Sequence, residues 1–220
     1  MIAMDLKRRS ALQLSAFAGL STLAACGRAT DLRPAAPGQP RQPRLMFIRH
    51  GEEPGSGVSG VAADGGTDPR SLSVRGWTRA GALVNLFDPR DSQGQQTPVR
   101  PELARPTKIF APDPGQTSSR RSLETITPLA AALNLTVDSR FAPTQTAQVA
   151  DAIRTVSQPL LVARKHEQIA EIISHLDGVT PAPPPWPKGR FDLIYLLDRL
   201  GTGWRFTCVP QLLLAGDRPA

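Results

Sequence analysis

The chain has 220 residues, of which 40% are hydrophobic and 5% aromatic, and its formal net charge is +7. This charge could indicate a nucleic-acid-binding protein, but residues 1–44 hold seven Lys or Arg against two Asp, whereas the remaining chain holds 19 against 17. The part that can fold is therefore nearly neutral, and it lacks the basic, aromatic-rich groove motif that nucleic acid requires. No nucleic-acid partner is expected.

Residues 1–26 have the pattern of an export signal. Lys7, Arg8 and Arg9 precede a run of small and apolar residues that is too short to span a bilayer as a permanent helix. The run ends in Leu23-Ala24-Ala25-Cys26, which resembles a bacterial lipobox, and the Arg8-Arg9 pair resembles a twin-arginine signal. We expect Cys26 to be lipidated after cleavage, which would anchor an exported protein on the periplasmic side of the cell envelope. An ordinary cleaved signal with an incidental Cys26 is the alternative.

Residues 27–43 are rich in Pro, Ala and polar groups and contain too few apolar residues to build a core. They are predicted to form a tether. At about 3.1 Å per residue for an extended Pro-rich chain, it would hold the following domain within roughly 50 Å of a membrane.

Residues 44–220 are enough for one domain, in which apolar runs of strand length alternate with helical patterns. The predicted strands are residues 45–48, 108–111, 159–163, 192–197 and 204–209. The predicted helices are residues 73–87 with Ser73 as N-cap, 119–133 with Pro128 inside, 149–156, and 166–176. This alternation predicts a three-layer α/β sandwich with a largely parallel sheet.

Ligands of such sheets bind beyond the carboxyl ends of the strands. Arg49 and His50 end the first predicted strand, His166 follows the third and opens a helix, and Arg121 lies near the start of the helix after the second. Two arginines and two histidines are thus predicted to meet at one edge of the sheet.

At these residues the sequence resembles the histidine phosphatase superfamily, which shares its fold with the phosphoglycerate mutases. The matching motifs are Arg49-His50-Gly51-Glu52, Leu72-Ser73-Val74-Arg75-Gly76, Arg121-Ser122-Leu123-Glu124-Thr125 and His166-Glu167-Gln168-Ile169. The resemblance covers residues 44–198 and implies that His50 attacks phosphorus, giving a phosphohistidine that water hydrolyses. It also implies that Arg49, Gly51 and Arg121 bind the phosphate and that His166 donates a hydrogen bond to it.

The chemistry favours these residue types, since a transferring phosphoryl group must be positioned and its oxygens stabilised, and planar guanidinium groups suit those oxygens. The general acid has two candidates. One branch of the family uses the carboxylate directly after the second histidine, where this chain has Glu167, and Glu52 is the second candidate.

No cofactor or metal is expected. Residues 55–60 match G-x-G-x-x-G, but the sequence after them cannot open the helix that a dinucleotide site needs. No group of His, Cys and carboxylate residues has the spacing of metal ligands. The expected function is hydrolysis of a small phosphorylated substrate without a metal. An inactive envelope protein that binds a phosphorylated ligand is the alternative, and the sequence is silent on the oligomeric state.

Overall fold

The computed structural model describes residues 43–219; the predicted export signal, the lipidation of Cys26 and the tether up to residue 42 lie outside the described residues. The chain forms four α-helices in this region, α1 (Val74–Phe87), α2 (Arg121–Leu133), α3 (Thr146–Arg154) and α4 (His166–Ser174). Its strands are β1 (Arg44–Arg49), β2 (Lys108–Phe110), β3 (Val137–Asp138), β4 (Leu160–Arg164), β5 (Val179–Thr180), β6 (Leu193–Leu200) and β7 (Gly203–Pro210).

The seven strands form one sheet in the order β3-β2-β4-β1-β6-β7-β5. β1 pairs in parallel with β4, β4 with β2 and β2 with β3, whereas β6 runs antiparallel to both β1 and β7. The predicted α/β class with a largely parallel sheet is confirmed. β3 and β5 were not predicted, because strands of two residues have no periodicity to detect.

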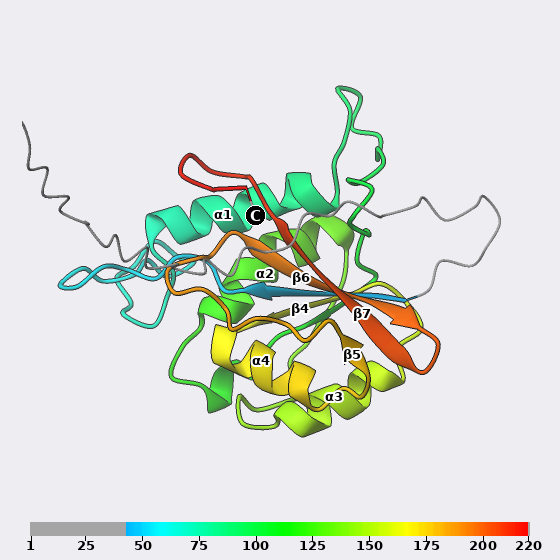
Figure 1. Ribbon diagram of the computed structural model, residues 1–220. Coiled ribbons are helices and arrows are strands. Elements are labelled where there is room, and N and C mark those ends of the chain that lie inside the picture. Colours follow the sequence, from blue (N-terminus) through cyan, green and yellow to red (C-terminus); the bar gives the residue numbers. More distant parts are fainter. Residues whose placement is uncertain (1–42, 220) are drawn as a thin grey trace, which may run out of the picture.

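The helices cover both faces of the sheet, so the structure has three layers (Figure 1). Alternate residues of the central strands point to opposite faces. Phe47 and Val162 pack with α3 and α4 in one core, whereas Met46 and Leu161 pack with α1 and α2 in the other. Both faces of β1 and β4 are therefore buried, which explains their uninterrupted apolar sequences.

α1 and α4 begin where the sequence indicated, whereas α2 begins two residues after its predicted start at residue 119. The Ser73 hydroxyl accepts a hydrogen bond from the Gly76 amide at 3.0 Å, as expected of an N-cap, and α1 begins at the next residue. Arg121 is the first residue of α2, and His166 is the first residue of α4. α3 ends at Arg154, before the predicted end at residue 156.

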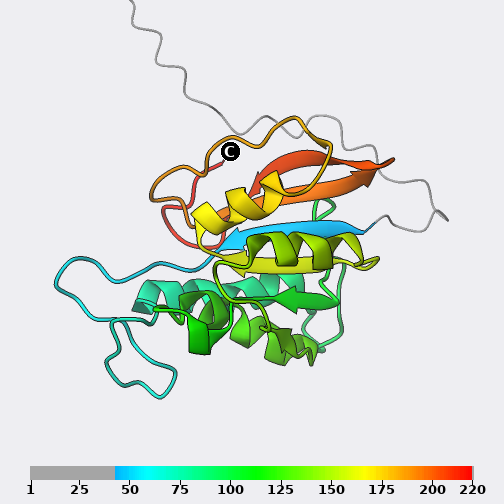
Figure 2. The same ribbon diagram turned by 90° about the horizontal axis from the view of Figure 1, so that it is seen from below.

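The strand ends bring the functional motifs to one edge of the molecule. β1 and β4 run in parallel with Arg49 opposite Arg164, so the residues that follow both strands emerge together. The loop over residues 54–70, drawn in cyan, extends outward at the end of the sheet toward which β1 points (Figures 1 and 2). No helix within residues 43–219 is long and apolar enough to cross a membrane.

Candidate active site

The His50 imidazole is buried directly after β1, with the residue only 3% exposed. Its Nδ1 lies 2.8 Å from the Gly51 carbonyl oxygen. Because a carbonyl can only accept a hydrogen bond, Nδ1 carries the proton and Nε2 keeps its lone pair. The His50 amide donates to the Arg164 carbonyl at 3.2 Å, which joins the residue to the end of β4.

Burial lowers the pKa of His50 to about 4. The hydrogen bond to Gly51 opposes this shift, as does the Glu53 carboxylate, whereas the positive charges of Arg49 and Arg121 add to the lowering of the pKa. His50 is therefore a neutral imidazole near pH 7, which is the form that can act as a nucleophile.

Gly51 holds the site together through its backbone. Its amide donates to the Thr125 hydroxyl at 2.7 Å, and this hydroxyl donates to the Arg121 carbonyl at 2.6 Å. A Cβ atom at Gly51 would lie 2.9 Å from the Gly76 carbonyl oxygen, and one at Gly76 would lie 2.4 Å from the Glu52 carbonyl oxygen. The glycines let the loop after β1 and the start of α1 approach closely, so three of the sequence motifs meet at this point.

Two arginines converge on the Glu53 carboxylate. Arg49 approaches one of its oxygens at 3.4 Å through Nη2, and Arg121 approaches the other at 3.3 Å through Nη1. The remaining Arg121 nitrogens donate to backbone carbonyls, with Nε 3.1 Å from Ser71 and Nη2 2.7 Å from Pro69. These bonds fix the direction of the Arg121 guanidinium, and one terminal nitrogen of each arginine faces the same anionic position, which the Glu53 carboxylate occupies.

The Arg49 guanidinium lies over the Phe191 ring, 3.9 Å from its centroid. Its Nε is buried and has no hydrogen-bond partner within the described residues. Burial lowers the pKa of Arg49. Three nearby carboxylates oppose this shift, and the largest opposing effect comes from Glu53.

His166 follows β4, the parallel neighbour of β1, two residues after Arg164, whose carbonyl accepts a hydrogen bond from the His50 amide. Burial lowers the pKa of His166, and the nearby charge of Arg49 lowers it further, while Glu167 and Glu53 oppose the shift. The charges of Arg49 and Glu53 thus act on the pKa of both histidines, with Arg49 lowering it and Glu53 raising it. As the first residue of α4, His166 also stands at the positive end of the helix dipole.

The carboxylates of the sequence motifs point in different directions. Glu52 accepts from Arg79 at 2.8 and 3.0 Å and from Arg75 at 3.0 Å, so both its oxygens are engaged in ion pairs. Glu124 accepts from the Ser71 hydroxyl at 2.6 Å and so braces the loop that orients Arg121. These two carboxylates are structural in this arrangement.

Glu167 remains near the site. Its Oε2 lies 3.2 Å from His166 Nδ1, although that nitrogen forms no hydrogen bond with any described residue, and the Glu167 side chain is 69% exposed. Glu53, the residue that sequence reasoning missed, is 47% exposed and pairs with both arginines. The only sequence signal for Glu53 was its place two residues after Gly51.

Arg164 was missed as well. This last residue of β4 is fully buried, its Nη1 donates to the Ala142 carbonyl at 3.2 Å, and Nε and Nη2 have no partner within the described residues. Burial lowers the pKa of Arg164 to about 10. An arginine that ends an apolar strand two residues before His166 was the available signal.

The structure thus brings together Arg49, His50, Gly51, Arg121 and His166, whereas Glu52 faces away toward α1. Within residues 43–219, no three His, Cys, Asp or Glu side chains are grouped so that they could hold a metal ion.

No protein-family model and no curated protein matches the chain. Three solved phosphatase structures resemble it at low sequence identity. The protein histidine phosphatase SixA complexed with tungstate has 14% identity and a TM-score of 0.48, covering 76% of this chain and 97% of SixA. The mycobacterial glucosyl-3-phosphoglycerate phosphatase has 17% identity and a TM-score of 0.45, with 76% and 97% covered. A phosphoserine phosphatase mutant from Entamoeba histolytica in complex with phosphoserine has 12% identity and a TM-score of 0.46, with 74% and 94% covered. Identities this low do not define an activity, which has to be argued from the site itself.

Proposed function

We propose that the protein hydrolyses phosphate monoesters through a phosphohistidine at His50, without a metal. The observation that carries this proposal is a buried, neutral imidazole with an unprotonated Nε2 beside two guanidinium groups that face one anionic position. The four motifs that resemble the histidine phosphatase superfamily support it, since their residues supply this arrangement.

In the first step, His50 Nε2 attacks phosphorus and the bond between phosphorus and the ester oxygen breaks. Arg49 and Arg121 bind the phosphoryl oxygens, on which charge develops, and His166 donates a hydrogen bond to one of them. The leaving alkoxide takes a proton from a carboxylic acid, which becomes a carboxylate.

In the second step, the carboxylate takes a proton from water and the oxygen of the water attacks phosphorus. The phosphorus–nitrogen bond breaks, inorganic phosphate leaves, and the lone pair returns to His50 Nε2. Dividing hydrolysis in this way replaces one difficult displacement by two easier ones. Both steps use the same arginine pair.

Glu53 is the carboxylate that best fits the acid role, with Glu167 as the second candidate. Both Glu52 oxygens are held by Arg75 and Arg79, so this carboxylate is poorly placed to follow a leaving group. A phosphate that binds Arg49 and Arg121 would displace the Glu53 carboxylate from the same nitrogens. The displaced side chain, which is exposed, would then lie beside the phosphoester oxygens.

The activity is tested by measuring phosphate release from an activated aryl phosphate and from a panel of metabolite phosphates, with a chelator present. The His50→Ala variant is measured beside the wild type. Turnover by the wild type alone supports the proposal. No turnover between about pH 5 and 8, where histidines titrate, together with tight binding of phosphate would favour the inactive phosphate-binding protein.

We further propose that the protein is exported and lipid-anchored through Cys26 on the periplasmic side of a bacterial membrane. The lipobox-like sequence and the Pro-rich segment that follows it support this location. A Cys26→Ser variant should then appear in the soluble fraction of the cells. If that variant sediments with membranes as the wild type does, the lipid anchor is wrong.

A further inference from the structure

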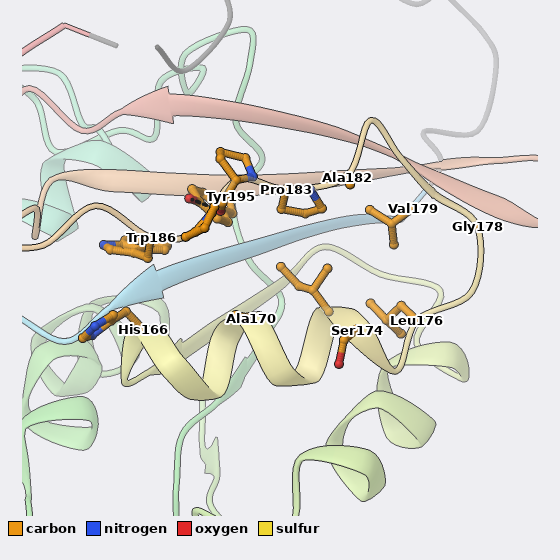
Figure 3. A pocket seen from close by; sticks show the side chains of 13 residues that line it. His166, Ala170, Ser174, Leu176, Gly178, Val179, Ala182, Pro183, Trp186 and Tyr195 are labelled. Carbon is orange, nitrogen blue, oxygen red and sulfur yellow. Dashed lines mark hydrogen bonds between the residues drawn. The ribbon is translucent and has the colours of Figure 1, made fainter. Parts of the chain in front are cut away.

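A cavity of about 550 Å³ begins at His166 and runs along α4. Figure 3 shows His166 at one end of the helix and Leu176 beyond the other, and the lining residues Ala170 and Ser174 lie between them. The opposite wall comes from residues 182–186 and from Tyr195 of β6. We call this cavity the α4 groove.

The α4 groove begins beside the candidate active site. His166, which lines its mouth, comes two residues after Arg164, whose carbonyl accepts a hydrogen bond from the His50 amide at 3.2 Å. A group attached to a phosphoryl group at this position therefore has the groove directly beside it. Its volume is within the range of about 300–1,000 Å³ that is typical of small-molecule sites.

Apart from His166 at the mouth, the polar side chains that line the groove have partners. The Trp186 Nε1 donates to the Arg190 carbonyl at 2.9 Å, the Tyr195 hydroxyl to the Pro184 carbonyl at 3.1 Å, and the Ser174 hydroxyl to the Glu171 carbonyl at 2.7 Å. A sugar or nucleoside in the groove would lose water from its hydroxyl groups and gain few protein partners in return, which is unfavourable.

The remaining walls are apolar. Among the described residues that line the groove, Ala170, Ile173 and Leu176 come from α4 and the segment that follows it, and three consecutive prolines follow Ala182. His166 and Tyr195 are the ionisable lining residues, and burial raises the pKa of Tyr195 to about 12, so its phenol is neutral. The groove thus favours an uncharged apolar ligand.

The shape of the α4 groove selects among apolar groups. α4 has nine residues and is therefore about 14 Å long at 1.5 Å per residue. An extended alkyl chain advances about 1.3 Å per carbon when its bonds are about 1.5 Å long, so about ten carbons fit beside the helix. A single aromatic ring would fill only one end.

We propose that the substrates are phosphate monoesters of long-chain aliphatic alcohols, with the phosphate on the two arginines and the chain in the α4 groove. This inference rests on the proposed phosphatase function and names its substrate class. The apolar wall contributes binding in the ground state and the transition state alike, so chain length should lower KM and leave kcat nearly unchanged.

The test is a series of n-alkyl phosphates from ethyl to dodecyl, each below its micelle-forming concentration and in detergent-free buffer. We expect kcat/KM to rise by up to about fourfold per methylene, the value for complete burial. The rise should stop near ten carbons, where the groove is full. Equal kcat/KM values for ethyl and decyl phosphate would overturn the proposal.

A blocking variant distinguishes the groove from general hydrophobicity. Ala170 is exposed and lines the groove, so Ala170→Trp should fill it without disturbing the core. The variant should hydrolyse ethyl phosphate like the wild type and should lose the advantage of decyl phosphate. The matched control is Ala131→Trp, at an exposed alanine of α2, which should retain the full dependence on chain length. A full chain-length dependence in Ala170→Trp would contradict the assignment to this groove.

A binding measurement separates this inference from the phosphatase function. Non-hydrolysable alkylphosphonates are titrated into the protein by calorimetry. Affinity that rises with chain length in the wild type but not in Ala170→Trp supports the groove, even if no phosphate ester is hydrolysed and the phosphatase proposal has failed. Hydrolysis of aryl and ethyl phosphates, with phosphonate affinity independent of chain length, overturns the groove alone.

Discussion

Protonation of His50 should cost the protein much of its stability in mild acid. Burial lowers the folded-state pKa of His50 to about 4, whereas a histidine in the unfolded chain has a pKa of about 6.5. The unfolded state therefore binds more protons between these values, and the contribution of His50 to stability is lost as the pH falls from about 6.5 toward 4. Linkage gives a loss of about 2 kcal/mol between pH 7 and pH 5, and about 3 kcal/mol by pH 4.

The assay is urea unfolding at pH 7 and pH 5 of the wild type and of His50→Asn, which removes the titrating group and keeps a polar side chain. Effects of other groups, including the lowered pKa of His166, are common to both proteins and cancel in the comparison. The wild type should lose about 2 kcal/mol more than the variant between these pH values. Equal losses would mean that His50 titrates normally, which would refute its burial as a neutral nucleophile.

Three further predictions follow from the ionic side chains. Glu52→Gln should lower the free energy of unfolding, measured in urea, by about 2 kcal/mol, because Arg79 loses one partner but keeps Asp217 at 2.7 Å. The variant should keep its kcat. A large loss of kcat with unchanged stability would return Glu52 to the acid role. Arg164→Met should raise the free energy of unfolding by about 1–4 kcal/mol, since it removes a buried and largely unpartnered charge. A destabilised variant would show that other groups stabilise the guanidinium in the folded protein. Glu53→Gln should slow alkyl phosphates more than phenyl phosphates in kcat assays, because a phenolate leaves without a proton, and equal losses on both esters would exclude Glu53 as the acid.

Much of the fold could be predicted because local signals agreed with the tertiary arrangement. The central strands β1 and β4 are buried on both faces and therefore read as continuous apolar runs. Ser73 caps α1 through its own side chain, so its role was visible in the sequence. β3 and β5 could not be predicted, because two-residue strands depend on their neighbours.

The candidate site could be predicted only in part, for a physical reason that Glu52 and Glu53 illustrate. The two residues are adjacent and chemically identical, yet Glu52 pairs with Arg79 of α1 and Glu53 with the two arginines of the site. Which carboxylate points inward depends on where α1 packs. The α4 groove could not be predicted for the same reason. Residues 182–186 form its wall only after they fold back over α4.

The central claim is tested most directly by trapping the covalent intermediate. The wild type and His50→Ala are mixed with a phosphorus-labelled aryl phosphate, denatured in alkali during turnover and digested. The account predicts an acid-labile, alkali-stable phosphoryl group on the peptide that contains His50, present in the wild type and absent from the variant. Turnover by the wild type without any label on that peptide, or undiminished turnover by His50→Ala, would contradict it.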